Sequence, residues 1–139
     1  MIVAVNKENA QEWAELVTSL WGDMTLEEAY EELSGLEYEF LYYDNEEPVA
    51  FFSLSLRHDY VEGTETSPVA YLEGIYVSPS HRKKGVAGHI IDFTKDWASQ
   101  KGCTELASDC ELDNEISRMF HTKLGFTEAN RIICFTMKL

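Results

Sequence analysis

The sequence predicts an α+β fold, in which a mixed, mostly antiparallel sheet of about six or seven strands carries helices on both faces. Short apolar segments rich in β-branched and aromatic residues alternate with segments whose apolar residues recur at helical spacing. No repeat, low-complexity segment or linker interrupts this pattern, and 139 residues suffice for one hydrophobic core. We therefore expect residues 1–139 to form a single domain.

The first half of the chain predicts a strand, two helices and a hairpin, in that order. After a short apolar strand over residues 2–5, Asn6 is expected to cap a helix that runs to Leu20. Thr25 and Glu28 have the spacing of a capping box, which predicts the start of a second helix. The other expected features are the end of this helix at Leu33, a left-handed stop at Gly35, hairpin strands over 39–43 and 49–57, and a polar loop over 58–68.

The second half is organised around residues 69–77, which are apolar, β-branched and aromatic and predict a mostly buried strand. Pro79 ends this strand because proline cannot donate a hydrogen bond to the ladder. Helical spacing of apolar residues then predicts a helix from about Gly85 to Gln100. Further on we expect a strand over 104–107, a helix capped by Asp113 or Asn114 that ends near Gly125, and last strands that involve Thr127 and residues 131–137.

The charge of the chain is strongly negative, with 11 basic and 25 acidic residues and a formal net charge of −14. Such a field repels nucleic-acid phosphates and attracts cations, so it argues against nucleic-acid binding and mildly supports a cationic substrate. Solubility alone would also explain it.

Neither a membrane-spanning apolar run nor a basic and apolar leader is seen in the sequence. The three cysteines, Cys103, Cys110 and Cys134, include no C-x-x-C pair, which predicts neither a disulfide framework nor a metal site. Unpaired thiols suit a reducing compartment, so we expect a cytoplasmic location.

The junction between the strand 69–77 and the next helix has the features of an anion site. A helix start carries free amide groups and about half a positive charge from the macrodipole. Gly85 and Gly88 leave room for a phosphate near the backbone, and Arg82, Lys83 and Lys84 add positive charge. The segment is neither a Walker loop nor a dinucleotide fingerprint. A basic turn that caps an ordinary helix is the alternative.

Arg82-x-x-Gly85-x-Ala87 after an apolar strand resembles the pyrophosphate-binding loop of the GCN5-related N-acetyltransferases, and Asn114 with Leu124-Gly125-Phe126 resembles their last helix. The two blocks span residues 69–128. The resemblance implies the acetyltransferase (GNAT-like) fold with acetyl-coenzyme A as cosubstrate. The implied cofactor contacts are Ile75, Tyr76, Val77, Arg82, Lys83, Lys84, Gly85, Val86, Ala87, Gly88 and Asn114.

A narrower resemblance, weakest over residues 22–50, is to the bacterial aminoglycoside 6'-N-acetyltransferases. It implies direct acetyl transfer to a 6'-amino group of a polycationic antibiotic in a ternary complex, and hence resistance. Relatives in this family are commonly dimers, and the apolar residues 132–135 would then pair or exchange between subunits. The matching segments are 55–61, 67–69, 72–75, 101–103 and 107–109.

Glu73 lies in the middle of an apolar strand, where an unpaired buried carboxylate would be costly. Gly74 beside it predicts a bulge that re-aims the side chain. The resemblance implies that Glu73 binds and deprotonates the acceptor amine. The alternative is a structural ion pair with Arg57 or Arg131.

By resemblance, Asp109 is a second catalytic acid at the substrate, and Tyr60 and Trp21 are substrate contacts. The alternatives are that Asp109 is a turn aspartate, that Tyr60 is an ordinary loop aromatic and that Trp21 anchors the first helix in the core. The acidic run from Glu27 to Glu32 would be either a substrate wall or a solvated face. Two departures from the family are His121, at a position where many members carry a tyrosine acid, and Asn130, where relatives carry a third acid.

Two other functions fit the same residues. The chain would acetylate another cationic amine, such as a polyamine or a peptide N-terminus, or it would be a sensor that binds coenzyme A or a cation without turnover.

Overall fold

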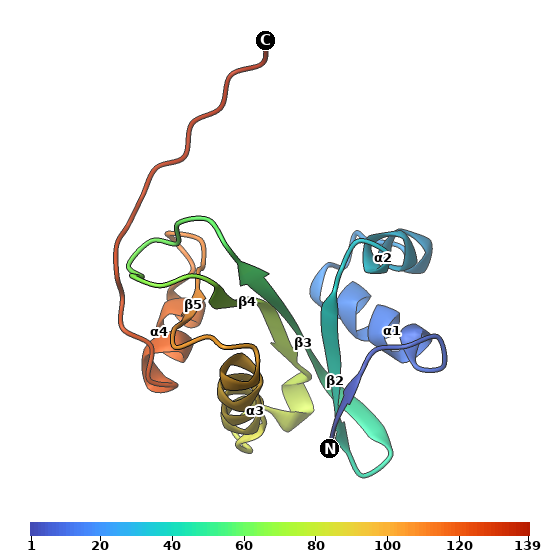
Figure 1. Ribbon diagram of the computed structural model, residues 1–139. Helices are drawn as coiled ribbons and strands as arrows, with labels where there is room; N and C mark the ends of the chain where they lie inside the picture. The colour runs from blue at the N-terminus through green and yellow to red at the C-terminus, as the bar shows by residue number, and fades with distance from the viewer.

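The computed structural model describes all residues from 1 to 139 and shows one five-stranded sheet between two layers of helices (Figure 1). The strand order is β1-β2-β3-β4-β5; neighbouring strands are antiparallel except β4 and β5, which are parallel. The elements are β1 (Ile2–Ala4), α1 (Ala10–Leu20), α2 (Leu26–Leu33), β2 (Tyr38–Asp44), β3 (Glu47–Arg57), β4 (Val69–Val77), η1 (Pro79–His81), α3 (Val86–Gln100), β5 (Leu106–Ser108) and α4 (Glu115–Lys123).

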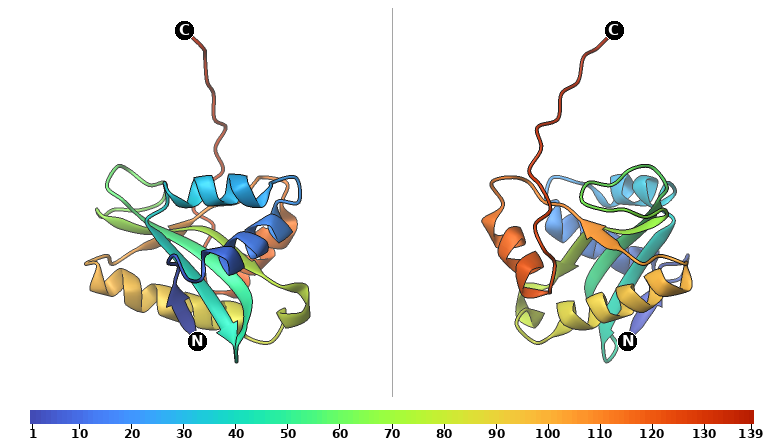
Figure 2. Two further views of the ribbon diagram at one scale, coloured as in Figure 1. Left: turned by 90° about the vertical axis from the view of Figure 1, so that its right-hand side faces the viewer. Right: turned by 60° about the vertical axis from the view of Figure 1, so that its left-hand side comes forward.

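The two helix layers bury opposite faces of the sheet, as Figure 2 shows from two sides. Helices α1 and α2 cover one face, where Trp13 and Val17 pack on Leu41 and Phe51. Helix α3 covers the other face, where Ile90 belongs to the cluster that contains Phe40 and Phe52. Adjacent residues of one strand therefore enter different cores, as strand alternation requires. None of the helices combines the length and the apolar character that a membrane crossing needs.

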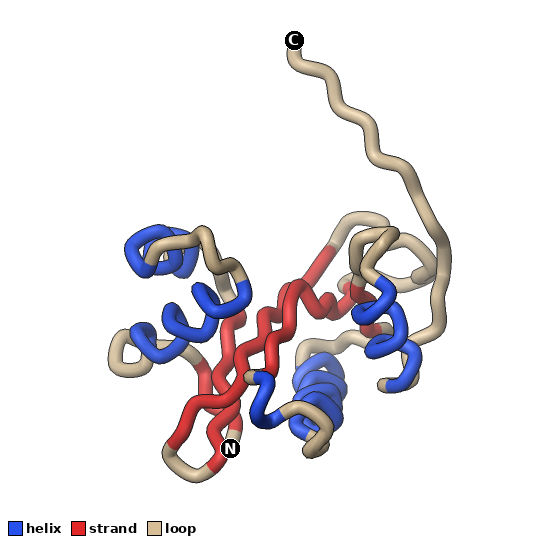
Figure 3. The backbone as a smooth tube through the Cα atoms, turned by 180° about the vertical axis from the view of Figure 1, so that it is seen from behind, coloured by secondary structure: helices blue, strands red, loops and turns tan.

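The last predicted strands are absent, so the sheet has five strands and not the expected six or seven. Residues 127–139 form no strand and leave the body of the molecule as an extended segment (Figures 1 and 3). We call this segment the C-terminal arm. Its apolar side chains are exposed because no strand of the same chain pairs with it. The apolar pattern of these residues indicates that they can form a strand, but a strand also needs a neighbouring strand to pair with.

Two helix boundaries differ from the sequence prediction. Helix α1 begins at Ala10 rather than after Asn6, because Asn6 and Asn9 hydrogen-bond to each other's backbone amides and form a turn first. Gly35 does not adopt the expected left-handed conformation, and α2 ends with Ser34 still in a right-handed conformation. The capping box is confirmed, with the Thr25 side chain accepting from the Glu28 amide at 3.1 Å and the Glu28 carboxylate accepting from the Thr25 amide.

Candidate active site

The sheet opens at the middle of β4. Strand β5 pairs only with Ala70, Tyr71 and Leu72, so the edge of β4 that faces β5 is unpaired from Glu73 onward. On the other side of β4, Ser53 pairs with Gly74 while Leu54 pairs with Leu72, which leaves Glu73 as an extra residue. The predicted bulge is therefore present, and it lies where the two parallel strands part.

The Glu73 carboxylate is ion-paired with Arg57, as the structural alternative for this residue anticipated. Arg57 Nη2 lies 2.7 Å from Glu73 Oε1, and the Ser55 hydroxyl donates to the same oxygen at 2.8 Å. The Glu73 side chain is still 35% exposed. A pair this exposed adds little stability, so it constrains the carboxylate without removing it from the surface. Arg131, the other partner considered, pairs with Glu128.

Arg57 connects Glu73 to the second candidate acid. Its guanidinium carbon lies 3.4 Å from the centre of the Tyr71 ring, and the Tyr71 hydroxyl donates to Asp109 Oδ2. Burial, followed by the hydrogen bond and charge of Asp109, raises the pKa of Tyr71 above its usual value. The structure thus brings the two predicted acids into one cluster, which we call the acidic cluster: Arg57, Tyr71, Glu73 and Asp109.

Sequence reasoning gave no role to Tyr71 and named Arg57 only as an ion-pair partner. Strand alternation was a usable signal, because Tyr71 stands two residues before Glu73. Burial would lower the pKa of Arg57, but the hydrogen bonds and charge of Glu73 outweigh it and raise that pKa.

A cavity of about 180 Å³ lies beside Glu73, between the sheet and the first two helices. We call it the acceptor cavity. Trp21, at the end of α1, lines it, with its ring 6.3 Å from that of Phe51. Of the acidic run on α2, Glu32 lines the cavity and Glu28 serves the capping box. Other lining residues are Leu36, Glu39 and Gly74.

Tyr60 is not part of this cavity. It lies in the loop after β3 and is 75% exposed. The cavity's lining residues come from α1, α2, β2, β3 and β4 with their connections, and residues 58–68 contribute none.

The start of α3 has the geometry predicted for an anion site. Gly85 is the N-cap with φ 82°, a left-handed conformation that favours glycine. The first helical hydrogen bond runs from the His89 amide to the Gly85 carbonyl at 3.1 Å, so the amides of Val86, Ala87 and Gly88 precede it. A β-carbon on Gly88 would meet no atom within 4 Å, which means that the space outside this turn is open.

The side chains around this helix start have different roles. Arg82 folds back, with Nε donating to the Val77 carbonyl at 2.9 Å, and so joins the loop to the end of β4. Lys83 and Lys84 are exposed and form no ion pair. Val86 is buried in the core beneath α3, so only its backbone is available to a ligand.

These features fit coenzyme A, which has an extended amide-bearing arm and a diphosphate. The unpaired edge of β4 at Ile75–Val77 can pair with the arm as an added strand would, and it leads to the open amides at the start of α3.

Asn114 and His121 lie near the end of β5. The Asn114 side chain accepts from the Ser117 amide at 3.0 Å and is the N-cap of α4, as its alternative interpretation anticipated. His121 is held between the Ser108 hydroxyl, 2.8 Å from Nε2, and the Ser117 carbonyl, 2.7 Å from Nδ1. Ser108 is the β5 residue that pairs with Leu72, so His121 is positioned where β4 and β5 part.

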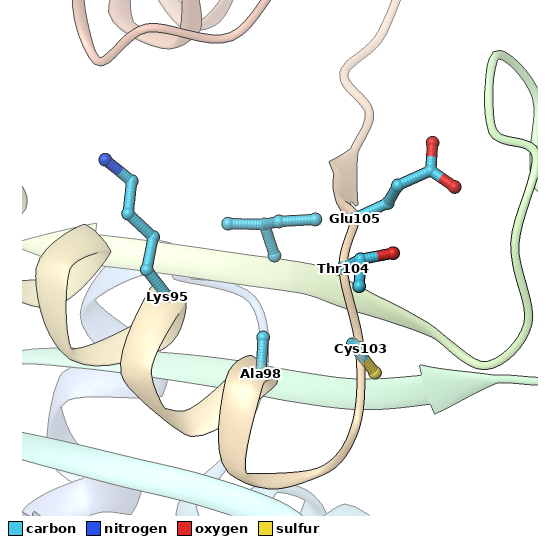
Figure 4. Close-up of a pocket in the computed structure, with 6 residues that line it drawn as sticks. Lys95, Ala98, Cys103, Thr104 and Glu105 are labelled. Carbon is cyan, nitrogen blue, oxygen red and sulfur yellow. The ribbon is translucent and has the colours of Figure 1, made fainter.

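A second cavity, of about 150 Å³, lies away from the acidic cluster. Figure 4 shows Lys95 and Ala98 of α3 on one side and Cys103, Thr104 and Glu105 on the other. Leu106 of β5 also lines it. Burial raises the pKa of the Cys103 thiol, and Lys95 and Glu105 line the cavity without forming an ion pair with each other.

A bulged strand edge that leads from an acidic cavity to a helix start with open amides is the arrangement that the acetyltransferase resemblance implies. The acetyltransferase (GNAT) family model matches residues 5–126, and the chain therefore belongs to this family.

The chain is also similar over its whole length to aminoglycoside N(6')-acetyltransferases type 1. It is 41% identical to that of Acinetobacter haemolyticus, with 99% of this chain and 98% of that protein covered. It is 37% identical to that of Serratia marcescens, with 100% and 99% covered.

Solved structures show the same relationship. The apo aminoglycoside antibiotic 6'-N-acetyltransferase AAC(6')-IG from Acinetobacter haemolyticus superposes with a TM-score of 0.94 at 40% identity, covering 100% of this chain and 99% of that one. AAC(6')-Iy in complex with the bisubstrate analog CoA-S-monomethyl-acetylneamine has a TM-score of 0.92 at 34% identity, with 100% and 98% covered.

Proposed function

We propose that this protein is an acetyl-coenzyme A-dependent N-acetyltransferase that acetylates the 6'-amino group of aminoglycosides and thereby confers resistance to them. The observation that carries the proposal is the unpaired edge of β4, which joins the acidic cluster and acceptor cavity to the open start of α3. Names and complexes of relatives that are 34–41% identical over their whole length support the same reaction.

The acceptor amine must lose a proton before it can attack, since an alkyl amine has a reference pKa of ~10.4. Glu73 lies at the end of the unpaired edge and is partly exposed, so it can bind the ammonium group and take its proton, directly or through one water. Asp109 adds a second negative charge that holds the acceptor; Arg57 keeps the Glu73 carboxylate in place, and the Tyr71 hydroxyl donates to Asp109.

The transferred acetyl group arrives as a thioester when acetyl-coenzyme A is bound. The backbone amides of Ile75 and Val77 are the donors available to the carbonyl oxygen as it gains charge, because they face the unpaired edge whereas the amide of Tyr76 faces β3. A thiol of reference pKa ~8.5 leaves readily, so His121 is not required as an acid. Trp21, which lines the acceptor cavity, and Tyr60, in the loop after β3, would contact the acceptor. Asn114 would contact the pantetheine arm.

The test of this function is a panel of acceptors incubated with acetyl-coenzyme A, read by release of free thiol. Aminoglycosides with a 6'-amino group, such as neamine, are expected to react, and a 6'-hydroxy analogue is expected not to react. If spermidine or a peptide reacts while neamine does not, the acceptor assignment is wrong. If coenzyme A binds tightly and no acceptor reacts, the protein is a sensor and not an enzyme.

Charge at the start of α3 provides a separate test of cosubstrate binding. Gly88→Asp places a carboxylate at the third residue of α3, where it stabilises the helix but repels a diphosphate. We expect the dissociation constant of coenzyme A to rise about tenfold or more, since like charges about 4 Å apart near a surface repel by roughly 1–4 kcal/mol.

The control for this variant is Gly88→Asn, which has the same size without the charge and the same open space around it. Calorimetry with coenzyme A compares the two. Equal affinities in both variants would show that the diphosphate does not lie at this helix start.

We also propose a homodimer, located in the cytoplasm, in which the C-terminal arm of one copy packs on the other. The first residues of the arm are fixed, with Asn130 donating to Glu62 at 2.6 Å and Ala129 lying against Gly63. Beyond them Ile133, Phe135 and Met137 are 78–87% exposed.

A second copy offers a matching surface for these side chains. The outer edge of β5 is unpaired, and the cavity at Leu106 in Figure 4 opens beside it. Leu112, Ile116 and Met119 on and before α4 are likewise exposed. An added apolar strand would cover all of them and would restore the missing strands of the predicted sheet.

A further inference from the structure

Glu39 is a buried carboxyl group that the proposed reaction does not use. It lies on β2, only 6% exposed, and accepts hydrogen bonds from Trp13 Nε1 at 3.1 Å and from the Ser53 hydroxyl. Burial raises the pKa of Glu39 to about 7, and these two hydrogen bonds, which act in the opposite direction, do not offset it. No lysine, arginine or histidine forms an ion pair with it.

The position of Glu39 places it in the wall of the acceptor cavity. Ser53, its hydrogen-bond partner, pairs across the sheet with Gly74, the residue next to Glu73, and all four line the same cavity. The other charged groups that face this space are Glu32 from α2 and Glu73 from β4; α1 and β3 contribute no charged side chain to it. Arg57 balances the charge of Glu73, but no cation balances that of Glu39.

A buried carboxyl without a cationic partner is costly when ionised, unless a ligand supplies the positive charge. The apolar part of the cavity wall includes Trp21 and Leu36, and an indole face attracts ammonium groups. The cavity therefore combines apolar walls with a carboxyl group whose charge is unmatched in the free protein.

We propose that ionised Glu39 binds an ammonium group of the acceptor other than the one that is acetylated, and so selects acceptors with a second amino group. This inference rests on the proposed function only in that the ligand is a polyamine-like acceptor. Binding of that cation draws the proton off Glu39, so acceptor affinity falls as the pH drops below 7.

Glu39→Gln is the central variant, because it keeps the shape and one acceptor oxygen while it removes the charge. We expect KM for neamine at pH 7.5 to rise about tenfold or more, with kcat changed by less than about threefold. In the wild type, KM should rise about tenfold per pH unit below the pKa of Glu39, and this dependence should disappear in the variant.

Ser53→Ala and Ser55→Ala form a matched pair that tests the assignment without removing Glu39. Ser53 donates to Glu39 and lowers its pKa, so Ser53→Ala should move the rise in KM to higher pH. Ser55 donates to Glu73, and Ser55→Ala should leave that midpoint in place. This pair also decides the matter if Glu39→Gln fails to fold.

A purely structural Glu39 gives a different result. Glu39→Gln would then lower the melting temperature and leave KM and its pH dependence at wild-type values, which would overturn the inference. Calorimetry with neamine separates this outcome from failure of the proposed function. Neamine binding that depends on Glu39 without acetyl transfer would support the inference and reject the enzyme, whereas transfer that is independent of Glu39 would do the reverse.

Discussion

Glu73→Ala is expected to lower kcat/KM for an aminoglycoside roughly 100-fold to 10,000-fold, the usual contribution of a positioned general base. Two effects act together. The variant loses the group that binds and deprotonates the amine, and it leaves the Arg57 guanidinium without its partner beside the acceptor cavity. An unpaired cation there repels an ammonium group. Glu73→Gln retains an acceptor oxygen for Arg57 and should therefore bind acceptors better than the alanine variant while turning over equally slowly.

Coenzyme A affinity, measured by calorimetry, should be unchanged in both variants, because the amides at the start of α3 do not depend on Glu73. Glu12→Gln is a suitable control, since Glu12 also accepts a side-chain hydrogen bond, from Tyr43, and lines neither cavity. Wild-type turnover in Glu73→Ala would remove this residue from the mechanism and leave Asp109 as the acid to test.

Truncation after Asn130 is expected to convert the protein from a dimer to a monomer. It removes Ile133, Phe135 and Met137, and full burial of three such side chains contributes roughly 5–9 kcal/mol before entropy losses. Light scattering should give twice the chain mass of 15.9 kDa for the full-length protein and the single mass for the truncated one.

The matched variants for this prediction lie within the arm. Phe135→Ser should weaken the dimer, and Lys138→Ala, which removes no apolar surface, should not. A full-length protein of 15.9 kDa at micromolar concentration would reject the dimer. In that case the arm would have to fold back on its own sheet.

The local features of this fold could be predicted from the sequence because each has its cause within a few residues. The Thr25 capping box, the strand 69–77, the bulge at Glu73 and the helix from Gly85 were all predicted and are all present. The family resemblance named Glu73, Asp109 and Trp21; Glu73 and Asp109 belong to the acidic cluster and Trp21 lines the acceptor cavity, while their roles stay predictions.

What could not be predicted depends on residues that are distant in the chain. The sequence pattern around Glu39 predicts only an ordinary strand residue. Its burial in the cavity wall depends on Trp13, a hydrogen-bond partner 26 positions away in the chain. The Asn6 cap is a local exception: Asn6 and Asn9 each accept from the other's amide, which forms a turn before the helix begins. The last strands are absent because residues 127–139 pair with no strand of the sheet.

The short pairing between β4 and β5 gives the two halves of the site unequal stiffness. Glu73 belongs to a strand that is paired along most of its length with β3, whereas Asp109 follows a three-residue strand held by a few ladder bonds. Elements with so few bonds open more often than the sheet around them. A cosubstrate arm that pairs with the unpaired edge of β4 would therefore stiffen the junction between β4 and β5. The distance between the Glu73 and Asp109 carboxylates would become fixed only when the cosubstrate is bound.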